Sequence, residues 1–329
     1  MSVTTGEIAK ICGVSRGTVD RALHGRPGIS PETRKKIIET AQKLGYRTNF
    51  VARSLVKGET KTLGVVAFDL YNRFFAQMVN AIEFRARELG YFIYLTLTNK
   101  DAEIEKKCIE HLVDRRVDGM LLCSVNNSYD YDKYLKSLNI PIVTIINKIS
   151  ESFYYVSIDD RLAMEQATKH VISKDYERII YLSPALEYKA RMNIYAVNQR
   201  LTGFTDAIHK HHSDIETIII NNKNFNNLFD KIKFTDSKKT AVIGTSDIYA
   251  LEVLNYFKKK GIRVPDDAGI MGFDNIDILK YIEPALATIS YPMDDIGIKA
   301  LDLLLRLIRG EDVNVVPVLE HRIVNGMSL

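Results

Sequence analysis

The sequence predicts a small all-α domain followed by an α/β core of two lobes, and two patterns predict this fold class. In the first 45 residues, apolar side chains recur at helical spacing in three short segments separated by turn residues. From residue 62 onward, short apolar runs alternate with longer amphipathic stretches, which is typical of parallel sheets with helices on both faces. Because residues 62–329 exceed what one such sheet needs, we expect two lobes.

The N-terminal helices are predicted from their capping residues. A capping box at Thr4 begins the first helix, and Ser15 caps a second helix over Arg16–Leu23. Ser30 precedes a third helix, which Gly45 terminates. Three short helices with a glycine turn between the first two make a helix-turn-helix domain.

The charge of this domain favours a nucleic-acid partner. The first 60 residues hold eleven Lys or Arg and five Asp or Glu, a net charge of +6, whereas the whole chain carries +4. A compact basic segment neutralises phosphates and supplies non-specific affinity for DNA. A small protein-binding domain with surface arginines remains the alternative. On the DNA hypothesis, the second helix enters the major groove, and Arg16 and Arg21 are the candidates for base contacts.

The N-terminal residues resemble a known family. Residues 5–23, 29–37 and 44–46 are similar to the headpiece of the lactose-repressor and galactose-repressor (LacI/GalR) family. The resemblance implies a double-stranded, pseudo-palindromic DNA operator as partner. It also implies a set of DNA-binding residues in the headpiece, which are Thr5, Ser15, Arg16, Gly17, Thr18 and Arg21.

The resemblance continues into residues 49–58, which are similar to the family's hinge segment, a helix that forms when two protomers meet on an operator. It implies that Asn49, Ala52 and Arg53 contact DNA and that Leu55 is an apolar wedge in the minor groove, which bends the duplex. A linker leucine packed against the core is the alternative for Leu55.

Three positions depart from the family pattern in this part of the chain. Gly17 stands where many relatives carry a base-reading side chain, Asp20 adds a negative charge near DNA, and Thr48 replaces the usual proline. The operator sequence therefore cannot be transferred from a relative.

The core is expected to bind its ligand where parallel strands end. In open α/β sheets, ligands bind outside the carboxyl ends of the strands, and between two lobes this position is a cleft. Aromatic, Arg, Asp and Asn side chains follow several predicted strands, and these residue types suit sugars because rings stack on C–H faces while polar groups bind hydroxyls. The strands are predicted over 63–68, 91–97, 119–123, 142–146, 179–182, 217–220, 240–243 and 269–272.

Core motifs at residues 200–204, 261–267 and 269–275 extend the resemblance over essentially the whole chain. The resemblance implies two Rossmann-like lobes, as in type I periplasmic-binding-protein-like folds, and a small sugar or sugar-derivative effector. The expected effector contacts are Tyr71, Phe74, Phe75, Asn147, Arg191, Arg200, Ser246, Asp274 and Tyr291. Helix capping by Asp274 and core packing by Phe75 remain open as alternatives.

Three of these positions also differ from the family. Ser246 sits where an asparagine is common, Tyr291 where a glutamine often marks the lobe crossover, and Asn147 near a position that usually holds an acid. The effector therefore need not be a common hexose.

The domain boundaries expected from these segments are 1–47 for the DNA-binding domain, 48–61 for the hinge and 62–329 for the effector-binding and dimerisation core. Lobe one is expected to comprise about 62–160 and 291–320, and lobe two about 161–290 and 321–329. The chain has no leucine heptad after the core, so we expect a homodimer rather than a tetramer built by a coiled coil.

Other function classes are weakened by missing motifs. The sequence has no GxGxxG or GxxxxGK[ST] loop and no GxSxG elbow, so no cofactor and no enzyme activity are expected. The histidines between 209 and 212 are expected to form a solvated face rather than a metal site. Paired carboxylates such as Asp159 and Asp160 are expected to cap helices. The absence of signal-peptide and membrane-spanning segments predicts a cytoplasmic protein with no membrane partner. A transcription regulator, expected to be a repressor, is therefore favoured over a periplasmic-type sugar-binding protein or a sugar-processing enzyme.

Overall fold

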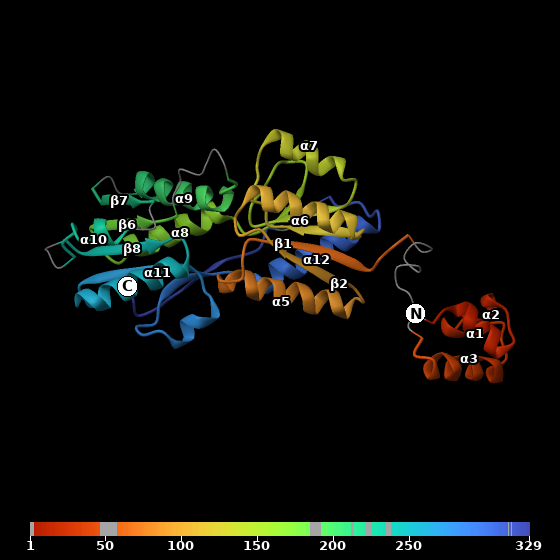
Figure 1. Cartoon of the computed structure of the whole chain (residues 1–329). Helices are drawn as coiled ribbons and strands as arrows, with labels where there is room; N and C mark the ends of the chain where they lie inside the picture. Colours follow the sequence, from red (N-terminus) through yellow and green to blue (C-terminus); the bar gives the residue numbers. More distant parts are fainter. Residues whose placement is uncertain are drawn as a thin grey trace. The chain divides into compact units, whose positions relative to one another are not determined.

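The structure of the chain is a computed structural model that describes residues 3–46, 58–184, 192–211, 214–221, 225–234, 238–314, 316 and 318–329. The chain divides into two compact units, Met1–Thr60 and Lys61–Leu329 (Figure 1). Among the described residues, no helix is both long and apolar enough to cross a membrane.

The N-terminal unit holds three helices, α1 (Thr5–Cys12), α2 (Arg16–Leu23) and α3 (Pro31–Lys43). The capping box at Thr4 is present, with the Glu7 backbone N–H donating to the Thr4 hydroxyl and the Glu7 carboxylate accepting from the Thr4 N–H. Gly13 adopts a left-handed φ of 73°, which permits the tight turn between α1 and α2. One core residue from each helix is fully buried: Ile8, Val19 and Ile37. The caps predicted from the sequence are thus confirmed.

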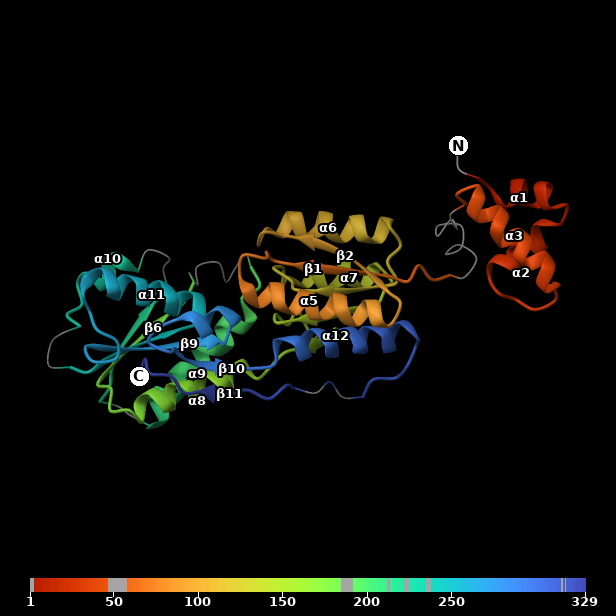
Figure 2. The same ribbon diagram turned by 90° about the horizontal axis from the view of Figure 1, so that it is seen from below.

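Lobe one of the core is built on a five-stranded parallel sheet of order β2-β1-β3-β4-β5. Helices α5 and α12 cover one face of this sheet, and α6 and α7 cover the other (Figures 1 and 2). Its elements are β1 (Thr62–Ala67), α5 (Arg73–Glu88), β2 (Phe92–Leu97), α6 (Ala102–Asp114), β3 (Gly119–Leu122), α7 (Tyr129–Ser137), β4 (Ile142–Ile145), β5 (Tyr154–Val156) and α12 (Met293–Ile308).

Lobe two is built on a six-stranded sheet of order β11-β10-β9-β8-β6-β7, in which only the β10–β11 pair is antiparallel. Helices α8 and α9 lie on one face, and α10 and α11 lie on the other (Figure 2). Its elements are α8 (Asp160–Ile172), β6 (Arg178–Leu182), α9 (Tyr195–His211), β7 (Glu216–Ile220), α10 (Asn226–Phe229), β8 (Thr240–Gly244), α11 (Asp247–Lys260), β9 (Ala268–Asp274), the 3-10 helix η2 (Asp277–Tyr281), β10 (Ala287–Ser290) and β11 (Arg322–Val324).

The sequence did not predict β5, β10 or β11. These strands are three or four residues long, and two of them, β5 and β11, are only partly buried and form the edges of their sheets. A segment so short has too few residues for the alternation that marks a strand, and these three lie outside the five-residue runs by which the equally short β3 and β4 are recognised. Their places become evident only once the neighbouring strands are assembled.

The chain passes between the lobes at several points. It leaves β5 for α8 and later leaves β10 for α12, and a parallel bridge joins Ile158 to Leu319 beside the first crossover. Outside the crossovers, Arg73 at the start of α5 forms a bidentate ion pair with Asp277 of η2, with both N–O distances at 2.6 Å. Backbone crossovers and a side-chain pair therefore both connect lobe one to lobe two.

Helices α8 and α9 are in tight contact at Gly203. A Cβ atom at this position would lie 2.1 Å from the carbonyl oxygen of Arg161, and that oxygen belongs to the backbone of α8. Replacement of Gly203 by Ala should therefore push the two helices apart and reduce the free energy of unfolding by about 1–3 kcal/mol, the usual range for overpacking.

Calorimetric unfolding of the core checks this expectation against Thr202→Ala. That neighbouring substitution adds no atom and removes a hydroxyl that bonds only within α9, to the Asn198 carbonyl, so it should change stability by no more than about 0.5 kcal/mol. Equal effects of the two variants would show that the helices are not in tight contact at Gly203.

Candidate functional site

The core holds a buried cluster of charged side chains centred on Arg200 of α9. Its Nε donates to Asp160 Oδ1 at 2.7 Å, and its Nη1 donates to the Thr245 carbonyl at 2.5 Å and to Asp274 Oδ1 at 3.4 Å. Arg200, Asp160 and Asp274 are each less than a tenth exposed. The cluster therefore joins α9, the start of α8 and the carboxyl ends of β8 and β9, which is where parallel strands place a ligand site.

The role of Asp160 corrects the sequence analysis, in which Asp159 and Asp160 were both interpreted as helix caps. Asp159 is the N-cap of α8 and accepts from the Leu162 N–H at 2.8 Å. Asp160 is the first residue of the helix and points inward to Arg200. Adjacent residues at a helix start point in different directions, so one carboxylate caps while the other enters the core.

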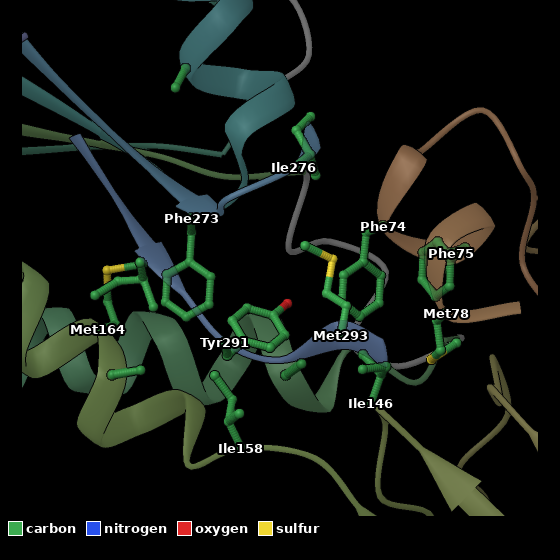
Figure 3. Close-up of a cluster of buried hydrophobic side chains, with 14 of the residues drawn as sticks. Phe74, Phe75, Met78, Ile146, Ile158, Met164, Phe273, Ile276, Tyr291 and Met293 are labelled. Carbon is green, nitrogen blue, oxygen red and sulfur yellow. The ribbon is translucent and has the colours of Figure 1, made fainter. Parts of the chain in front are cut away.

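Two aromatic side chains complete the cluster. The Arg200 guanidinium carbon lies 3.7 Å from the ring centroid of Phe273, a cation–π contact. The Tyr291 hydroxyl donates to Asp274 Oδ1 at 2.8 Å and lies 3.5 Å from Arg200 Nη2. Figure 3 shows the Tyr291 ring between Phe273 of lobe two and Phe74 of lobe one, with the Tyr291 and Phe74 centroids 5.8 Å apart.

Burial sets the protonation of the acids. Burial raises the pKa of Asp160, although Arg200 opposes this effect. Burial also raises the pKa of Asp274 to about 6, again opposed by Arg200. The pKa of Asp247, the first residue of α11, rises to about 8 because of burial and the nearby Asp274. For Arg200, burial lowers the pKa, but Asp160, Tyr291 and Asp274 together raise it above its usual value, so the guanidinium stays charged.

The backbone is strained at Asp274 in the cluster and at Ile146 beside Asn147. Asp274 has a φ of 116° and Ile146 has a φ of 68°, values that non-glycine residues rarely adopt. Such strain collects at functional sites, where the surrounding packing holds the residue in place.

The structure brings some of the expected effector contacts to this cluster and not others. Arg200, Asp274 and Tyr291 are direct members, and Phe74 contacts the Tyr291 ring. Phe75 is buried among Phe68 and Phe74, in core packing. Tyr71 lies apart from the Arg200 cluster, since 93% of this residue is exposed. Ser246 precedes α11 as its N-cap residue but makes no side-chain capping bond, and Arg191 lies outside the described residues.

Asn147 connects the lobes instead of facing the charged cluster. Its Nδ2 donates to the Ser124 carbonyl at 3.2 Å and the Asn193 carbonyl at 2.8 Å, while its Oδ1 accepts from the Ala196 N–H at 3.2 Å. The Asn193 Nδ2 in turn donates to the Lys148 carbonyl of lobe one at 3.0 Å. The two asparagines thus tie the β3 and β4 ends of lobe one to the start of α9.

Sequence reasoning missed Asp160 and Asn193 as members of these networks, whereas Phe273 directly follows the strand predicted over 269–272, where a ligand site is expected. Asp160 carried no usable signal, because the strand before it, β5, was itself not predicted from the sequence. Asn193 lies in an irregular segment before α9, and nothing in its surroundings in the sequence marks it.

The N-terminal unit presents a candidate DNA-binding face on α2. Ser15 caps α2 by accepting from the Thr18 N–H, and its hydroxyl also pairs with the Thr18 hydroxyl at 2.9 Å. Arg16, Gly17 and Arg21 are exposed, and Thr5 is half-buried at the start of α1. Gly6 leaves room for the Arg16 guanidinium, because a Cβ there would lie 2.9 Å from its Nη2.

Asp20 is compensated within the same unit. Its carboxylate lies 3.3 Å from Arg26 Nη1 and 3.0 Å from His24 Nδ1, so its negative charge is paired. The expected hinge contacts Asn49, Ala52, Arg53 and Leu55 lie outside the described residues.

Metal ligation finds no support in the part of the chain that the structure describes, because no group of three or more His, Cys, Asp or Glu there is placed to hold an ion. Cys12 and Cys123 are buried free thiols, and Cys108 is half-buried.

Comparisons with known proteins agree with both units. Residues 4–49 match the bacterial regulatory proteins of the lacI family, and residues 168–329 match the periplasmic binding protein-like domain. The chain is 30% identical to catabolite control protein A of Priestia megaterium over 336 residues, which cover 98% of each chain. The chain belongs to the LacI family. The family resemblance and the fold class expected from the sequence are confirmed, and this LacI-family chain is a DNA-binding transcription regulator.

Two solved structures show the same fold as this LacI-family chain. The lac repressor dimer bound to operator and the anti-inducer ONPF has a TM-score of 0.86 at 22% identity, over 100% of this chain and 99% of that one. A periplasmic binding protein/LacI transcriptional regulator from Alkaliphilus metalliredigens QYMF, complexed with D-xylulofuranose, has a TM-score of 0.69 at 27% identity. That match covers 82% of this chain and 98% of the other. The curated relative is a regulator rather than an enzyme.

The pKa of Asp247 predicts how stability depends on pH. The folded chain holds this proton more tightly than the unfolded chain, so stability is lost as pH rises from about 4 towards 8. Asp247→Asn has no proton to lose, and its amide oxygen can still accept from the Ile276 N–H. Its stability relative to the wild type should therefore increase with pH, by at most about 1.4 kcal/mol per pH unit.

Urea unfolding of the core at pH 5 and pH 8 measures this difference. The same gap between the variant and the wild type at both pH values would contradict the raised pKa.

Proposed function

We propose that this LacI-family chain is a homodimeric repressor of carbohydrate-utilisation genes that binds a pseudo-palindromic operator and is controlled by a small sugar-like effector between its two core lobes. The observation that carries the effector part is the buried Arg200 cluster. A charged guanidinium, carboxylates and aromatic rings meet there at the carboxyl ends of β8 and β9. These groups bind hydroxyls and stack on C–H faces. A solved LacI-type neighbour was crystallised with D-xylulofuranose, which agrees with this ligand class.

The DNA part of the proposal rests on α2. Its N-terminus is capped by Ser15, and two arginines, Arg16 and Arg21, are exposed on it. An exposed helix of this kind fits the major groove, where Arg recognises guanine edges. The expected contacts of the hinge, Asn49, Ala52, Arg53 and Leu55, belong to the same proposal.

The proposed dimer rests on exposed apolar side chains on the edge strand and α5 of lobe one and on η2 of lobe two. In lobe one, β2 is an edge strand that exposes Phe92 and Tyr94, and the adjacent α5 exposes Phe84. In lobe two, Tyr281 and Ile278 are exposed on η2. Exposed apolar patches on an unpaired edge strand suit pairing with a second copy. The lac repressor neighbour was crystallised as a dimer.

In the proposed mechanism, two α2 helices occupy major grooves about one turn apart. An effector changes the balance between two arrangements of the lobes only through contacts that differ between them. Arg200, Asp274 and Tyr291 are placed for such contacts because lobe two and a lobe crossover meet at them. We propose a binding function without a catalytic step, performed in the cytoplasm, where the operator lies.

The proposal is tested by selecting binding duplexes from a random library at fixed physiological salt, because DNA affinity depends steeply on ionic strength. The expected result is a pseudo-palindrome with half-sites about one helical turn apart. Recovery of sequences without any consensus, in the presence and absence of a sugar panel, would contradict a sequence-specific regulator.

Arg16→Ala should relax the preference at one base position in each half-site of the recovered operator, at a cost of roughly 1–3 kcal/mol in discrimination. The matched control is Arg34→Ala on α3, whose guanidinium donates to the Arg26 carbonyl. Measured against the same duplex library, the Arg34 variant should keep the preference of the wild type. A preference that is unchanged in the Arg16 variant would remove this residue from the base contacts.

A further inference from the structure

Tyr291 is a large side chain buried at the junction of the two lobes. It is 5% exposed, and its ring packs on Phe74 of lobe one and on Phe273 of lobe two, with centroid distances of 5.8 Å for both pairs. Figure 3 shows the ring between these two phenylalanines, with Met293 beside it. The aromatic walls that could hold a ligand ring therefore already hold a ring that belongs to the chain.

The hydroxyl of Tyr291 is bound to the same polar groups that would bind a sugar hydroxyl. It donates to Asp274 Oδ1 at 2.8 Å and accepts from Arg200 Nη2 at 3.5 Å. A phenol hydroxyl offers one donor and two acceptor lone pairs, as a sugar hydroxyl does. The other hydrogen bonds of the guanidinium go to Asp160, Asp274 and the Thr245 carbonyl, so each of its three nitrogens has a partner.

We propose that Tyr291 is an internal occupant of the effector site, whose ring and hydroxyl take the position of an effector ring, so that an effector binds by displacing this side chain. The inference rests on the proposed function in one respect, namely that the Arg200 cluster is the effector site. It goes further by assigning to Tyr291 the role of a competitor instead of a contact.

Competition from Tyr291 sets requirements on the effector. A molecule that replaces the phenol must present an apolar ring face to Phe273 and a hydroxyl that both donates to Asp274 and accepts from Arg200. A carboxylate or phosphate on the ring is disfavoured there, because Asp160 and Asp274 already surround the single guanidinium. The site thus selects uncharged cyclic polyols, and their apparent affinity is reduced by the fraction of molecules in which Tyr291 occupies the site.

Displacement of Tyr291 would also move a segment that leads directly into lobe one. The residue lies on the crossover that leaves β10, two residues before α12 begins at Met293. Helix α12 packs against α5, β3 and β4, and Gly297 of α12 has no room for a Cβ beside Met78 and Ile82 of α5. A movement of this crossover therefore shifts a tightly packed helix pair, which is not free to deform gradually.

The test uses the full chain with Tyr291→Ala and Tyr291→Phe. The probe is p-cresol, whose methyl carbon corresponds to the tyrosine Cβ and whose ring and hydroxyl match the rest of the side chain. A buried cavity of this shape admits a small aromatic molecule. Calorimetric titration should show p-cresol binding to the Ala variant at least 10-fold more tightly than to the wild type. The Phe variant keeps the ring and should not bind p-cresol.

A second titration uses D-xylose, D-ribose, D-glucose and D-galactose. The sugar that binds should bind the Ala variant at least 10-fold more tightly than the wild type, and p-cresol should compete with it. The Phe variant lacks the hydroxyl that bonds to Asp274 and Arg200. Its ring is therefore displaced more easily, and its sugar affinity should rise by roughly 3- to 10-fold, the factor expected for one hydrogen bond. If the Ala variant does not fold, the Phe variant carries this comparison alone.

Tyr131→Ala is the matched control. Tyr131 is another buried tyrosine, and its hydroxyl donates to Glu105 within lobe one. Any p-cresol that enters the cavity left at this position should not compete with sugar, and the sugar affinity should stay that of the wild type.

The outcomes separate this inference from the proposed function. Failure of every sugar to bind the wild type or either Tyr291 variant would contradict the sugar class of the proposed function, whether or not p-cresol enters the Ala variant, because removal of any buried tyrosine leaves a cavity for p-cresol. Equal sugar affinity in the wild type and both Tyr291 variants, without competition from p-cresol, would overturn the inference and leave the sugar-controlled regulator in place.

Discussion

The burial of one guanidinium is the constraint on which the core depends. Arg200 cannot lose its proton in practice, so its charge must be compensated where water does not reach it. The partners come from Asp160 at the start of α8, the Thr245 carbonyl after β8 and Asp274 at the end of β9. These segments are far apart in the sequence, and a buried unpaired guanidinium would cost several kcal/mol. The guanidinium therefore fixes where α8, α9, β8 and β9 meet.

The same interaction explains why the site is at this place and why it is coupled to the rest of the core. Tyr291 attaches the β10–α12 crossover to the guanidinium and to Asp274, and its ring reaches Phe74 of lobe one. The Asn147–Asn193 bonds hold the start of α9 to lobe one from another direction. A ligand that alters the surroundings of Arg200 thus acts on groups that both lobes share, which is the physical condition for a binding event to bias an arrangement of domains.

Much of this fold could be predicted from the sequence because the information is local. The buried central strands are continuous apolar runs, and the caps at Thr4, Ser15 and Ser30 each show a polar side chain at a helix start. Arg200 and Asp274 were found through motifs of the family. Asp160 was misinterpreted because a pair of carboxylates before a helix gives no sign of which one points inward. That distinction depends on the direction of the helix relative to α9, which is a property of the assembled lobe.

The placement of Tyr291 is a second example of this limit. The family resemblance places Tyr291 at the lobe crossover, and from this position it could only be assigned as a contact to the effector. Its partners Phe74 and Asp274 lie 217 and 17 positions away, so only the packed core reveals that the ring lies among the groups it was expected to share with a ligand. The hinge residues around Leu55 stay predictions, since they lie outside the described residues.

The ion pair between Arg73 and Asp277 has a consequence for the environment in which the protein works. It joins the lobes at the surface, where Arg73 is about half exposed, whereas the contacts of Arg200 are buried. Mobile ions screen exposed charges over about 8 Å at 0.15 M salt and about 3 Å at 1 M, and they affect buried pairs much less. An osmotic upshift that concentrates ions around the protein therefore loosens one connection between the lobes and leaves the other intact. The strength of the connection between the lobes thereby depends on ionic conditions.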